Sequence, residues 1–208
     1  VFSAAWAGQP QANEALAHLA GDRLTPAIVR ATALFALFND SSTDIDGRIK
    51  ATRDTEPVVR AAAADGLEAT PAATRTAALT PLLGDPVRAV RIAAARSLSS
   101  LPRDQLDSSR LADFDAAVAE YIAAQSISLD MPGAHLNLAV LYQNIGRIDL
   151  AEAHYLDALR LDPDFTPARA NLARLYNATS RNADAERVLV EGLKRMPAIG
   201  ELQYSLGL

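Results

Sequence analysis

The chain contains no cysteine. This absence excludes disulfide bonds, thiolate metal sites, cysteine nucleophiles and covalent haem attachment within its 208 residues. Aromatic residues are scarce, at 5% of the sequence. There is no window of about 18 uninterrupted apolar residues, so the sequence predicts no segment that spans a bilayer. No charged-then-apolar leader opens the chain either.

The sequence signatures of common enzyme sites are missing as well. There is no glycine-rich phosphate loop, no G-x-S-x-G turn and no H-E-x-x-H motif. His18, His135 and His154 fall in three different helical segments without a partner at ligand spacing, so we expect surface or helix-flanking histidines. Two acidic pairs flank helix ends, where such residues commonly cap helices: Asp113/Asp115 and Asp162/Asp164. The sequence therefore predicts no catalytic residue, no metal site and no cofactor in this chain, and it does not indicate an enzyme.

The net charge of -5 is unevenly distributed along the chain. Residues 1–105 carry 11 Lys and Arg against 11 Asp and Glu, whereas residues 106–208 carry 9 against 14. A protein that binds phosphates needs a clustered positive surface, so the sequence argues against a nucleic-acid partner. Half of the residues are hydrophobic, which is enough apolar surface for the cores of one or two domains.

The first half of the sequence contains a repeat of about 30 residues. Three segments align on a Val-Arg pair: 25–37 (TPAIVRATALFAL), 56–67 (EPVVRAAAADGL) and 85–98 (DPVRAVRIAAARSL). In each one a proline follows a capping-type or acidic residue, as is typical of a helix start, and a leucine closes the run. The alanines between them allow neighbouring helices to approach closely. A second helix is predicted upstream of each segment: 11–21, 44–53 and 74–83.

A helix pair of this size cannot bury its apolar face alone, so we expect the pairs to stack around one continuous core. The Asp-Pro start and the Val-Arg-x-Ala run resemble HEAT repeats, particularly the short bacterial type, and the third copy is the best match. The predicted fold class is all-α, a right-handed α-solenoid of antiparallel helix pairs.

The second half has a longer period of 34 residues, seen in the segments 135–163 and 169–197. Seven pairs of equivalent residues are in register: Leu138/Leu172, Ala139/Ala173, Tyr142/Tyr176, Ala151/Ala185, Tyr155/Leu189, Ala158/Gly192 and Pro163/Pro197. Small residues at the closest helix crossing admit bulky ones from the partner helix, and the proline ends the pair. This pattern resembles the tetratricopeptide repeat (TPR) residue by residue.

These two patterns predict two domains, a HEAT-like α-solenoid over residues 1–104 and a TPR array over residues 105–208. The array is predicted to contain a half repeat (113–130), full repeats (132–165 and 166–199) and a truncated repeat from residue 200. Because the chain begins at Val1 without a methionine and stops at Leu208 inside a pattern, we expect it to be a piece of a longer protein.

Arginine recurs at one position of each HEAT-like repeat, and an aspartate precedes it at a short distance. The six residues are Asp22, Arg30, Asp54, Arg60, Asp85 and Arg91. Stacking places equivalent residues in a row, so we expect an ion-pair ladder between neighbouring repeats, as is typical of the HEAT family. A basic stripe facing a ligand is the alternative. Arg88 and Arg96 have no counterparts in the other copies, so they are predicted to be solvated surface.

TPR domains bind extended or helical peptides along a concave face, at first-helix positions that the packing signature leaves free. Carried onto this sequence, those positions are Leu136, Val140, Gln143, Ala170, Arg174 and Asn177. TPR domains that grip a C-terminal carboxylate have lysine and asparagine where this chain has Leu136 and Val140, so such a clamp is not expected. The resemblance implies a mixed apolar and polar groove for a peptide or a neighbouring domain. Alternatively, these positions pack against the rest of the parent protein.

The repeats favour a non-enzymatic scaffold that binds proteins or peptides. Their order also resembles the C-terminal region of some large bacterial multihaem c-type cytochrome proteins. That resemblance implies a docking arm of an electron-transfer protein that contacts a haem-bearing region of the same polypeptide or complex. It places haem c only in the parent protein and implies a periplasmic or extracellular location; without it we expect a cytoplasmic one. HEAT-like repeats also occur in phycobilin lyases, which act on tetrapyrroles, but that reading leaves the TPR half unexplained.

Overall fold

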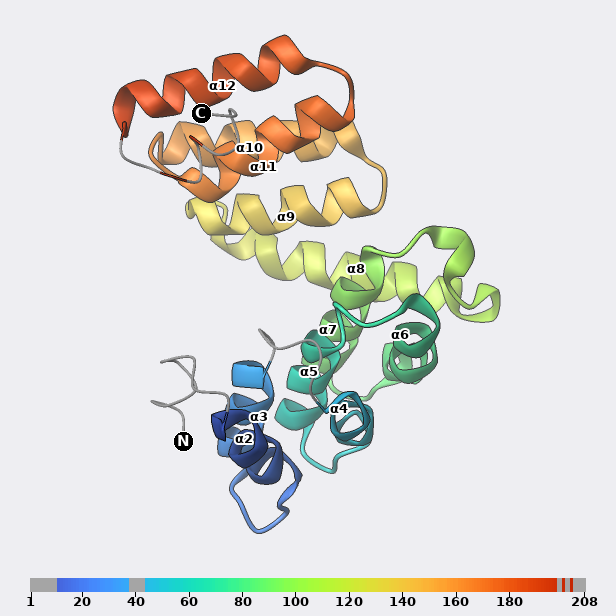
Figure 1. The fold of residues 1–208 in the computed structure, drawn as a ribbon. Helices are drawn as coiled ribbons and strands as arrows, with labels where there is room; N and C mark the ends of the chain where they lie inside the picture. The colour runs from blue at the N-terminus through green and yellow to red at the C-terminus, as the bar shows by residue number, and fades with distance from the viewer. Residues whose placement is uncertain (1–10, 38–43, 198–199, 201–202, 204–208) are drawn as a thin grey trace. The chain divides into compact units, whose positions relative to one another are not determined.

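The structure is a computed structural model that describes residues 11–37, 44–197, 200 and 203. All regular elements in these ranges are helices, and no strand occurs among them (Figure 1). The chain divides into two compact units, residues 1–121 and 122–208. The predicted all-α fold of stacked helix pairs, an α-solenoid, is confirmed.

Two kinds of helix alternate along the first unit. The Val-Arg segments form α3 (Ala27–Ala36), α5 (Pro57–Gly66) and α7 (Arg88–Ser99). The predicted partner helices are α2 (Gln11–Gly21), α4 (Ile45–Ala51) and α6 (Ala72–Leu79), and a 3-10 turn at Thr80–Gly84 follows α6. Each partner helix packs on the Val-Arg helix that follows it, α3 packs on α5, and α5 packs on α7. The pairs therefore stack through their Val-Arg helices.

The residues that define the first repeat are core residues. The closing leucines Leu37, Leu67 and Leu98 are at most 1% exposed, and Val59 and Val90 are fully buried. Alanines of the same helices are also buried. Because alanine is small, the Val-Arg helices approach one another closely enough to bury these leucines and valines between them.

The Val-Arg helices all begin two residues before the valine of their Val-Arg pair, at Ala27, Pro57 and Arg88, but their prolines fall at different places relative to that start. Pro57 is the first residue of α5, Pro26 caps α3, and Pro86 lies two residues before α7. The expectation that Asp85-Pro86 starts the helix is therefore wrong by a few residues. The reason is local: the Asp85 carboxylate accepts a hydrogen bond from the backbone N–H of Val87 at 2.9 Å, which holds an extended turn before the helix.

After α7 the chain forms two 3-10 turns, Arg103–Gln105 and Ser108–Arg110, and then α8 (Leu111–Gln125), which a further 3-10 turn at Ser126–Ser128 follows. The division between the two compact units falls within α8. The predicted domain boundary at 104/105 separates two types of repeat and stays a prediction.

The second unit contains the two predicted TPR helix pairs. They are α9 (Pro132–Asn144) with α10 (Ile148–Leu161), and α11 (Thr166–Ala178) with α12 (Asn182–Arg195). The pairs also pack on each other through α10 and α11. Among the signature residues, Leu138, Ala139, Tyr155, Leu172 and Ala173 are at most 1% exposed. The predicted truncated repeat lies outside the described residues except for 200 and 203.

No helix in the described ranges combines the length and the apolar character that crossing a membrane requires.

Candidate functional site

Arginine–carboxylate pairs join neighbouring repeats of the first unit. Arg30 on α3 binds the carboxylate of Asp54, which precedes α5. Arg60 on α5 donates from Nε and Nη2 to the two carboxylate oxygens of Asp85 at 2.7 and 2.9 Å. Arg91 on α7 donates in the same manner to Glu120 on α8 at 3.0 and 2.5 Å. Each pair is bidentate, the strongest geometry available to arginine and a carboxylate.

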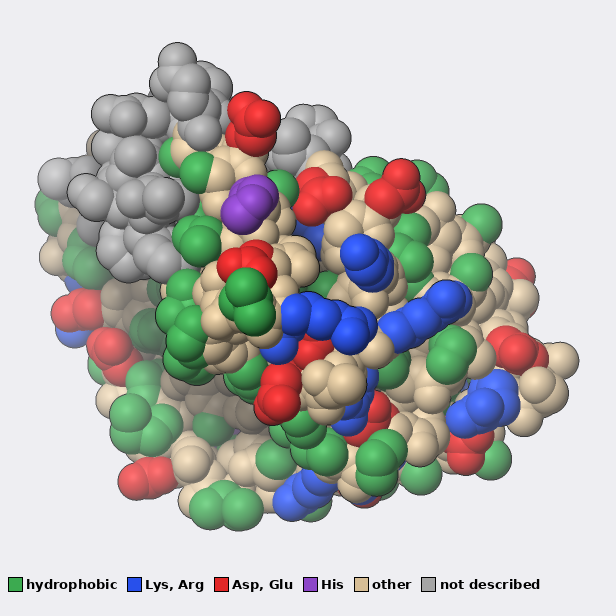
Figure 2. Space-filling model, turned by 90° about the horizontal axis from the view of Figure 1, so that it is seen from below, with side chains coloured by type: hydrophobic (Ala, Val, Ile, Leu, Met, Phe, Trp, Pro, Cys, Tyr) green, Lys and Arg blue, Asp and Glu red, His purple; other side chains and the backbone are tan. Residues whose placement is uncertain are grey.

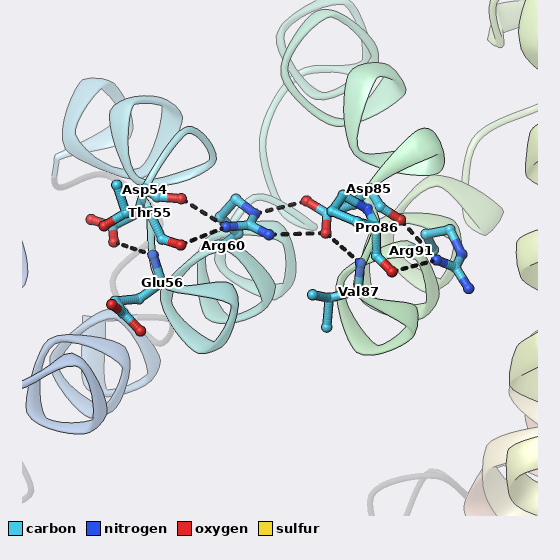
Figure 3. Close-up of polar contacts among 8 residues, drawn as sticks. All are labelled: Asp54, Thr55, Glu56, Arg60, Asp85, Pro86, Val87 and Arg91. Atoms are coloured by element: carbon cyan, nitrogen blue, oxygen red, sulfur yellow. Dashed lines mark hydrogen bonds and ion pairs between the residues drawn. The ribbon is translucent and has the colours of Figure 1, made fainter.

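The arginines of these pairs also bind the backbone of their own repeat (Figure 3). Arg60 Nη1 donates to the carbonyl oxygens of Asp54 and Thr55 at 2.8 and 3.1 Å. Arg91 Nη1 donates to the carbonyls of Asp85 and Pro86 at 2.7 and 3.2 Å. Asp54 and Asp85 thus offer a carbonyl to the arginine of their own repeat and a carboxylate to the arginine of the preceding one. The result is a continuous polar chain along the stacked repeats.

The first two pairs of this ladder are buried. Arg30 and Asp54 expose 6% and 10% of their side chains, and Arg60 and Asp85 expose 13% and 6%. Burial opposes the ionisation of both aspartates, but the hydrogen bonds from the arginines and from backbone N–H groups outweigh it and lower the pKa of each carboxyl. Because the guanidinium groups are enclosed and already paired, these contacts support a structural ladder over a basic stripe that faces a ligand.

Two acidic residues differ from the ladder that the sequence predicts. Asp22 accepts hydrogen bonds from the backbone of Leu24 and the hydroxyl of Thr25, both at 2.9 Å, within its own turn. Glu120 takes the last place, although sequence reasoning missed it. It lies on α8, in the predicted TPR half repeat, where the Val-Arg pair that aligns the HEAT-like copies does not recur.

Arg88 and Arg96, predicted to be solvated surface, both make specific contacts. Arg96 forms a half-buried ion pair with Asp65 at 2.6 Å, which links α7 to α5, so the prediction for Arg96 is wrong. Burial raises the pKa of Asp65 in spite of this pair. Arg88 is exposed, and it donates to the backbone carbonyl of Glu120 at 2.8 Å.

A second set of arginines, which sequence reasoning also missed, binds the carbonyl groups at helix ends. Buried Arg48 on α4 donates to the carbonyls of Leu37 and Gly66, at the ends of α3 and α5. Arg75 on α6 donates to the carbonyl of Ser97 at 3.1 Å, near the end of α7. The last carbonyls of a helix have no partner within it, so these arginines supply one. The signal available in the sequence was one arginine within each of the partner helices α4 and α6.

Three of the six predicted groove residues lie on the surface of the TPR unit. Val140 on α9 is 37% exposed, and Arg174 and Asn177 on α11 are also exposed. The two helices contact each other. Arg174 donates to the side-chain oxygen of Asn171 at 2.5 Å, on its own helix.

The other three predicted groove residues are engaged by the fold. Ala170 is 1% exposed and belongs to the core, so it does not line a surface. Leu136 is half-buried and packs against the same core. The side-chain oxygen of Gln143 accepts a hydrogen bond from the hydroxyl of buried Tyr155 at 2.9 Å. Three of the six predicted residues are therefore engaged by the fold, and a groove along them stays a prediction.

The histidines also differ from expectation. His135 is 6% exposed, and its Nδ1 lies 2.9 Å from Nδ1 of His154. The expectation of surface or helix-flanking histidines is thus wrong for His135. Sequence spacing did not reveal the contact because the two residues lie on different helices that meet only when the TPR pair folds.

The acidic pairs near helix ends are bound by arginines. Asp113 and Asp115 pair with Arg110 and Arg103, and Asp164 pairs with Arg195 at 2.6 Å. Asp162 accepts a hydrogen bond from the backbone N–H of Asp164 at 2.9 Å. These contacts are of the structural kind expected at helix ends.

Positive and negative side chains are mixed on the face of the molecule that Figure 2 shows. Figure 2 shows one face of the molecule, on which Lys and Arg side chains lie among Asp and Glu, with hydrophobic side chains between them. This face does not present the continuous positive surface that binding to nucleic acid requires.

The fold and these contacts define a helical-repeat protein in which two kinds of helix pair follow one another. Two family models agree with this division: residues 45–128 match HEAT repeats, and residues 132–165 match the tetratricopeptide repeat. The predicted order of HEAT-like and then TPR repeats is therefore confirmed. No curated protein matches the chain. Both families typically mediate protein–protein interaction and are generally non-enzymatic scaffolds.

Proposed function

We propose that the chain is a scaffold that binds a protein or peptide on the first helices of its TPR unit, α9 and α11. The observation that carries the proposal is that α9 and α11 each have one set of residues in the core and another set on the surface. The packing positions Leu138 and Leu172 are at most 1% exposed, whereas Val140, Arg174 and Asn177 are exposed and are not needed by the core.

The chemistry of the three exposed residues suits a particular kind of partner. Val140 offers an apolar contact, Arg174 a positive charge, and Asn177 an amide that both donates and accepts hydrogen bonds. Within the described part of the chain Arg174 donates to Asn171 from Nη2, which leaves its other N–H groups for a carboxylate. A helical or extended segment with an apolar side chain near an acidic one is the partner that these groups fit best.

A double substitution tests the proposal. Val140→Glu with Arg174→Glu places two negative charges on the proposed surface without entering the core. We expect unchanged far-UV circular dichroism and an affinity for the partner, once one is isolated with the unmodified chain and purified, that is at least about tenfold weaker.

The matched control is Leu156→Glu with Arg187→Glu. These residues are also an exposed leucine and an exposed arginine of the same unit, but they lie on the second helices, α10 and α12. The control variant is expected to bind as the unmodified chain does. Unchanged binding by the first double variant would show that the contact surface lies elsewhere.

The alternative of a docking arm in a multihaem cytochrome is not part of this proposal, because neither family match supports a haem-bearing partner. Several C-x-x-C-H motifs in a parent sequence upstream of Val1 would revive that alternative, and a parent sequence without cysteine would end it.

A further inference from the structure

Two histidines and an aspartate come together between α9 and α10 of the first TPR pair. His135 lies on α9, and His154 and Asp157 lie one turn apart on α10, so they share a face of that helix. The two histidine Nδ1 atoms are 2.9 Å apart, and Oδ2 of Asp157 lies 3.8 Å from Nδ1 of His135. One potential ligand atom of each residue lies within 4.8 Å of the other two.

The surroundings of His135 fix the position of its proton. Nε2 lies 3.0 Å from the carbonyl oxygen of Leu129, which can only accept a hydrogen bond, so Nε2 is the protonated nitrogen. Nδ1 then turns its lone pair toward His154 and Asp157. An imidazole that donates one N–H to a backbone carbonyl and offers its other nitrogen to the site is the usual arrangement of a metal ligand.

His154 is held in place by an aromatic neighbour. Tyr142 stacks on its imidazole with the ring centroids 5.4 Å apart and the planes at 8°. Because Nδ1 of His135 accepts, Nδ1 of His154 donates the hydrogen bond between them at 2.9 Å, and an ion bound through this nitrogen takes the tautomer with the proton on Nε2.

Asp157 supplies the negative charge of the cluster and lies on its solvent-exposed side. Its Oδ1 accepts a hydrogen bond from Arg160 at 2.7 Å, which leaves Oδ2 directed to His135. The Arg160 side chain is 74% exposed, so this ion pair is weak and yields readily. The side chain of Asp157 is 38% exposed while that of His135 is 7% exposed, so the cluster has a buried end and a side that a hydrated ion can enter.

The spacing of the three groups fits a small divalent ion. In a tetrahedral zinc site, ligand bonds of roughly 2.0–2.2 Å place neighbouring donor atoms about 3.3 Å apart. The separations of 2.9 and 3.8 Å lie on either side of that value, and all three donor atoms lie within 4.8 Å of one another, so side-chain rotations bring the donors into place. Two imidazoles and one carboxylate are a donor set that zinc prefers, and three protein ligands leave a position for water.

We propose that His135, His154 and Asp157 bind a divalent transition-metal ion of the zinc type, through Nδ1 of each histidine and Oδ2 of the aspartate, with water completing the coordination. The ion ties the two helices of the first TPR pair to each other. This site is independent of the proposed binding surface on α9 and α11, and either can hold without the other.

Metal titration of the full 208-residue chain tests the site. The chain is prepared without a polyhistidine tag, freed of metal with a chelator, and titrated with Co²⁺ and then with Zn²⁺. We expect one Co²⁺ per chain with visible d–d bands, displacement of those bands by one equivalent of Zn²⁺, and a melting temperature that rises with Zn²⁺ concentration. The absence of saturable binding overturns the proposal.

Three variants locate the bound ion. His154→Ala and Asp157→Asn are each expected to weaken Zn²⁺ binding at least about tenfold, since the loss of even an outer-shell partner has effects of that size. Asp157→Asn keeps the size of the side chain, so it tests the site even where His154→Ala disturbs the fold. His18→Ala, on α2 of the first unit, is the control and is expected to bind like the unmodified chain. Equal binding by all three variants, or loss of binding in His18→Ala, overturns the assignment.

Discussion

Arg60 and Asp85 form two parallel hydrogen bonds, Nε to Oδ2 at 2.7 Å and Nη2 to Oδ1 at 2.9 Å, and they join two successive repeats through them. Both side chains are nearly buried, Arg60 Nη1 also donates to the carbonyl of Asp54, and Asp85 Oδ1 also accepts from the backbone N–H of Val87. A charge enclosed in this way depends on its partner, because water cannot replace the lost contact.

Asp85→Asn is therefore expected to lower the free energy of unfolding of the first unit by about 3 kcal/mol, since it leaves the Arg60 charge uncompensated. Denaturation followed by far-UV circular dichroism measures the loss, and amide hydrogen exchange of α5 and α7 locates it. Asp115→Asn breaks the pair with Arg103, whose side chains are 56% and 54% exposed, and should cost less than about 1 kcal/mol. Equal losses in the two variants would contradict the ladder's structural importance.

Acidic pH should remove the stabilisation that the arginine–carboxylate ladder gives to the first unit. Since folding lowers the pKa values of Asp54 and Asp85, the ladder stabilises the first unit above the unfolded pKa of about 4, and this stabilisation is lost as pH falls below it. A protonated Asp85 resembles asparagine, so the stability difference between the unmodified chain and Asp85→Asn should shrink as pH falls below about 4 toward the lowered pKa of folded Asp85. Denaturation curves at several pH values measure this difference. A difference that does not decrease as pH falls below about 4 would mean that the charge of Asp85 is not its cause.

The parts of the ladder that recur were predictable from the sequence. Arginine and aspartate recur at the positions of Arg60, Asp54 and Asp85 because stacking brings these positions together at every repeat. The regular spacing in the sequence reflects that contact. Glu120 was not predictable in this way, because α8 lacks the Val-Arg pair on which the three HEAT-like copies align. Arg48 escaped notice for another reason: its partners are backbone carbonyls, which leave no trace in the residue types around them.

In the TPR unit, too, the residues that recur with the period were predictable from the sequence, and a contact made only once was not. The buried signature residues followed from the 34-residue period, because the packing at each helix crossing demands a small residue. Ala170 was misplaced because the family pattern defines which helix lines the groove but not how deep each position lies in this chain. The contact between His135 and His154 depends on how α9 crosses α10, which residue spacing does not encode.

Tyr155 predicts a response to alkaline pH. Burial raises the pKa of this side chain to about 12, above the unfolded value of about 10. The protonated phenol therefore stabilises the second unit below pH 10, and this contribution is lost as pH rises through 12. Tyr155→Phe should cost about 1 kcal/mol at pH 7, because the hydrogen bond to Gln143 is lost. That deficit should disappear between pH 10 and pH 12, since phenylalanine does not ionise. Denaturation at pH 7, 10 and 11.5 checks this, and a constant deficit would contradict it.

Gly146 and Ser180 occupy equivalent positions just after α9 and α11, and both have a positive φ, +78° and +61°. The turns are closed by matching hydrogen bonds. Arg147 N–H donates to Tyr142 and Arg181 N–H donates to Tyr176, both at 2.8 Å, the pattern in which glycine commonly ends a helix. A side chain at such a φ costs roughly 1 kcal/mol or more relative to glycine. Since a Cβ at Gly146 would meet nothing within 4 Å, a change there would test the backbone alone.

Ser180→Gly should therefore stabilise the second unit by about 1 kcal/mol, slightly reduced by the greater freedom of glycine in the unfolded chain. Gly146→Ser, the reciprocal change in the preceding repeat, should destabilise the unit by a similar amount. Urea denaturation of the two single variants and of the double variant measures both effects. Because the two turns are separate, the double variant should return close to the stability of the unmodified chain. If Ser180→Gly instead lowers stability, the serine side chain contributes contacts that outweigh its backbone strain, and the equivalence of the two turns does not extend to their energetics.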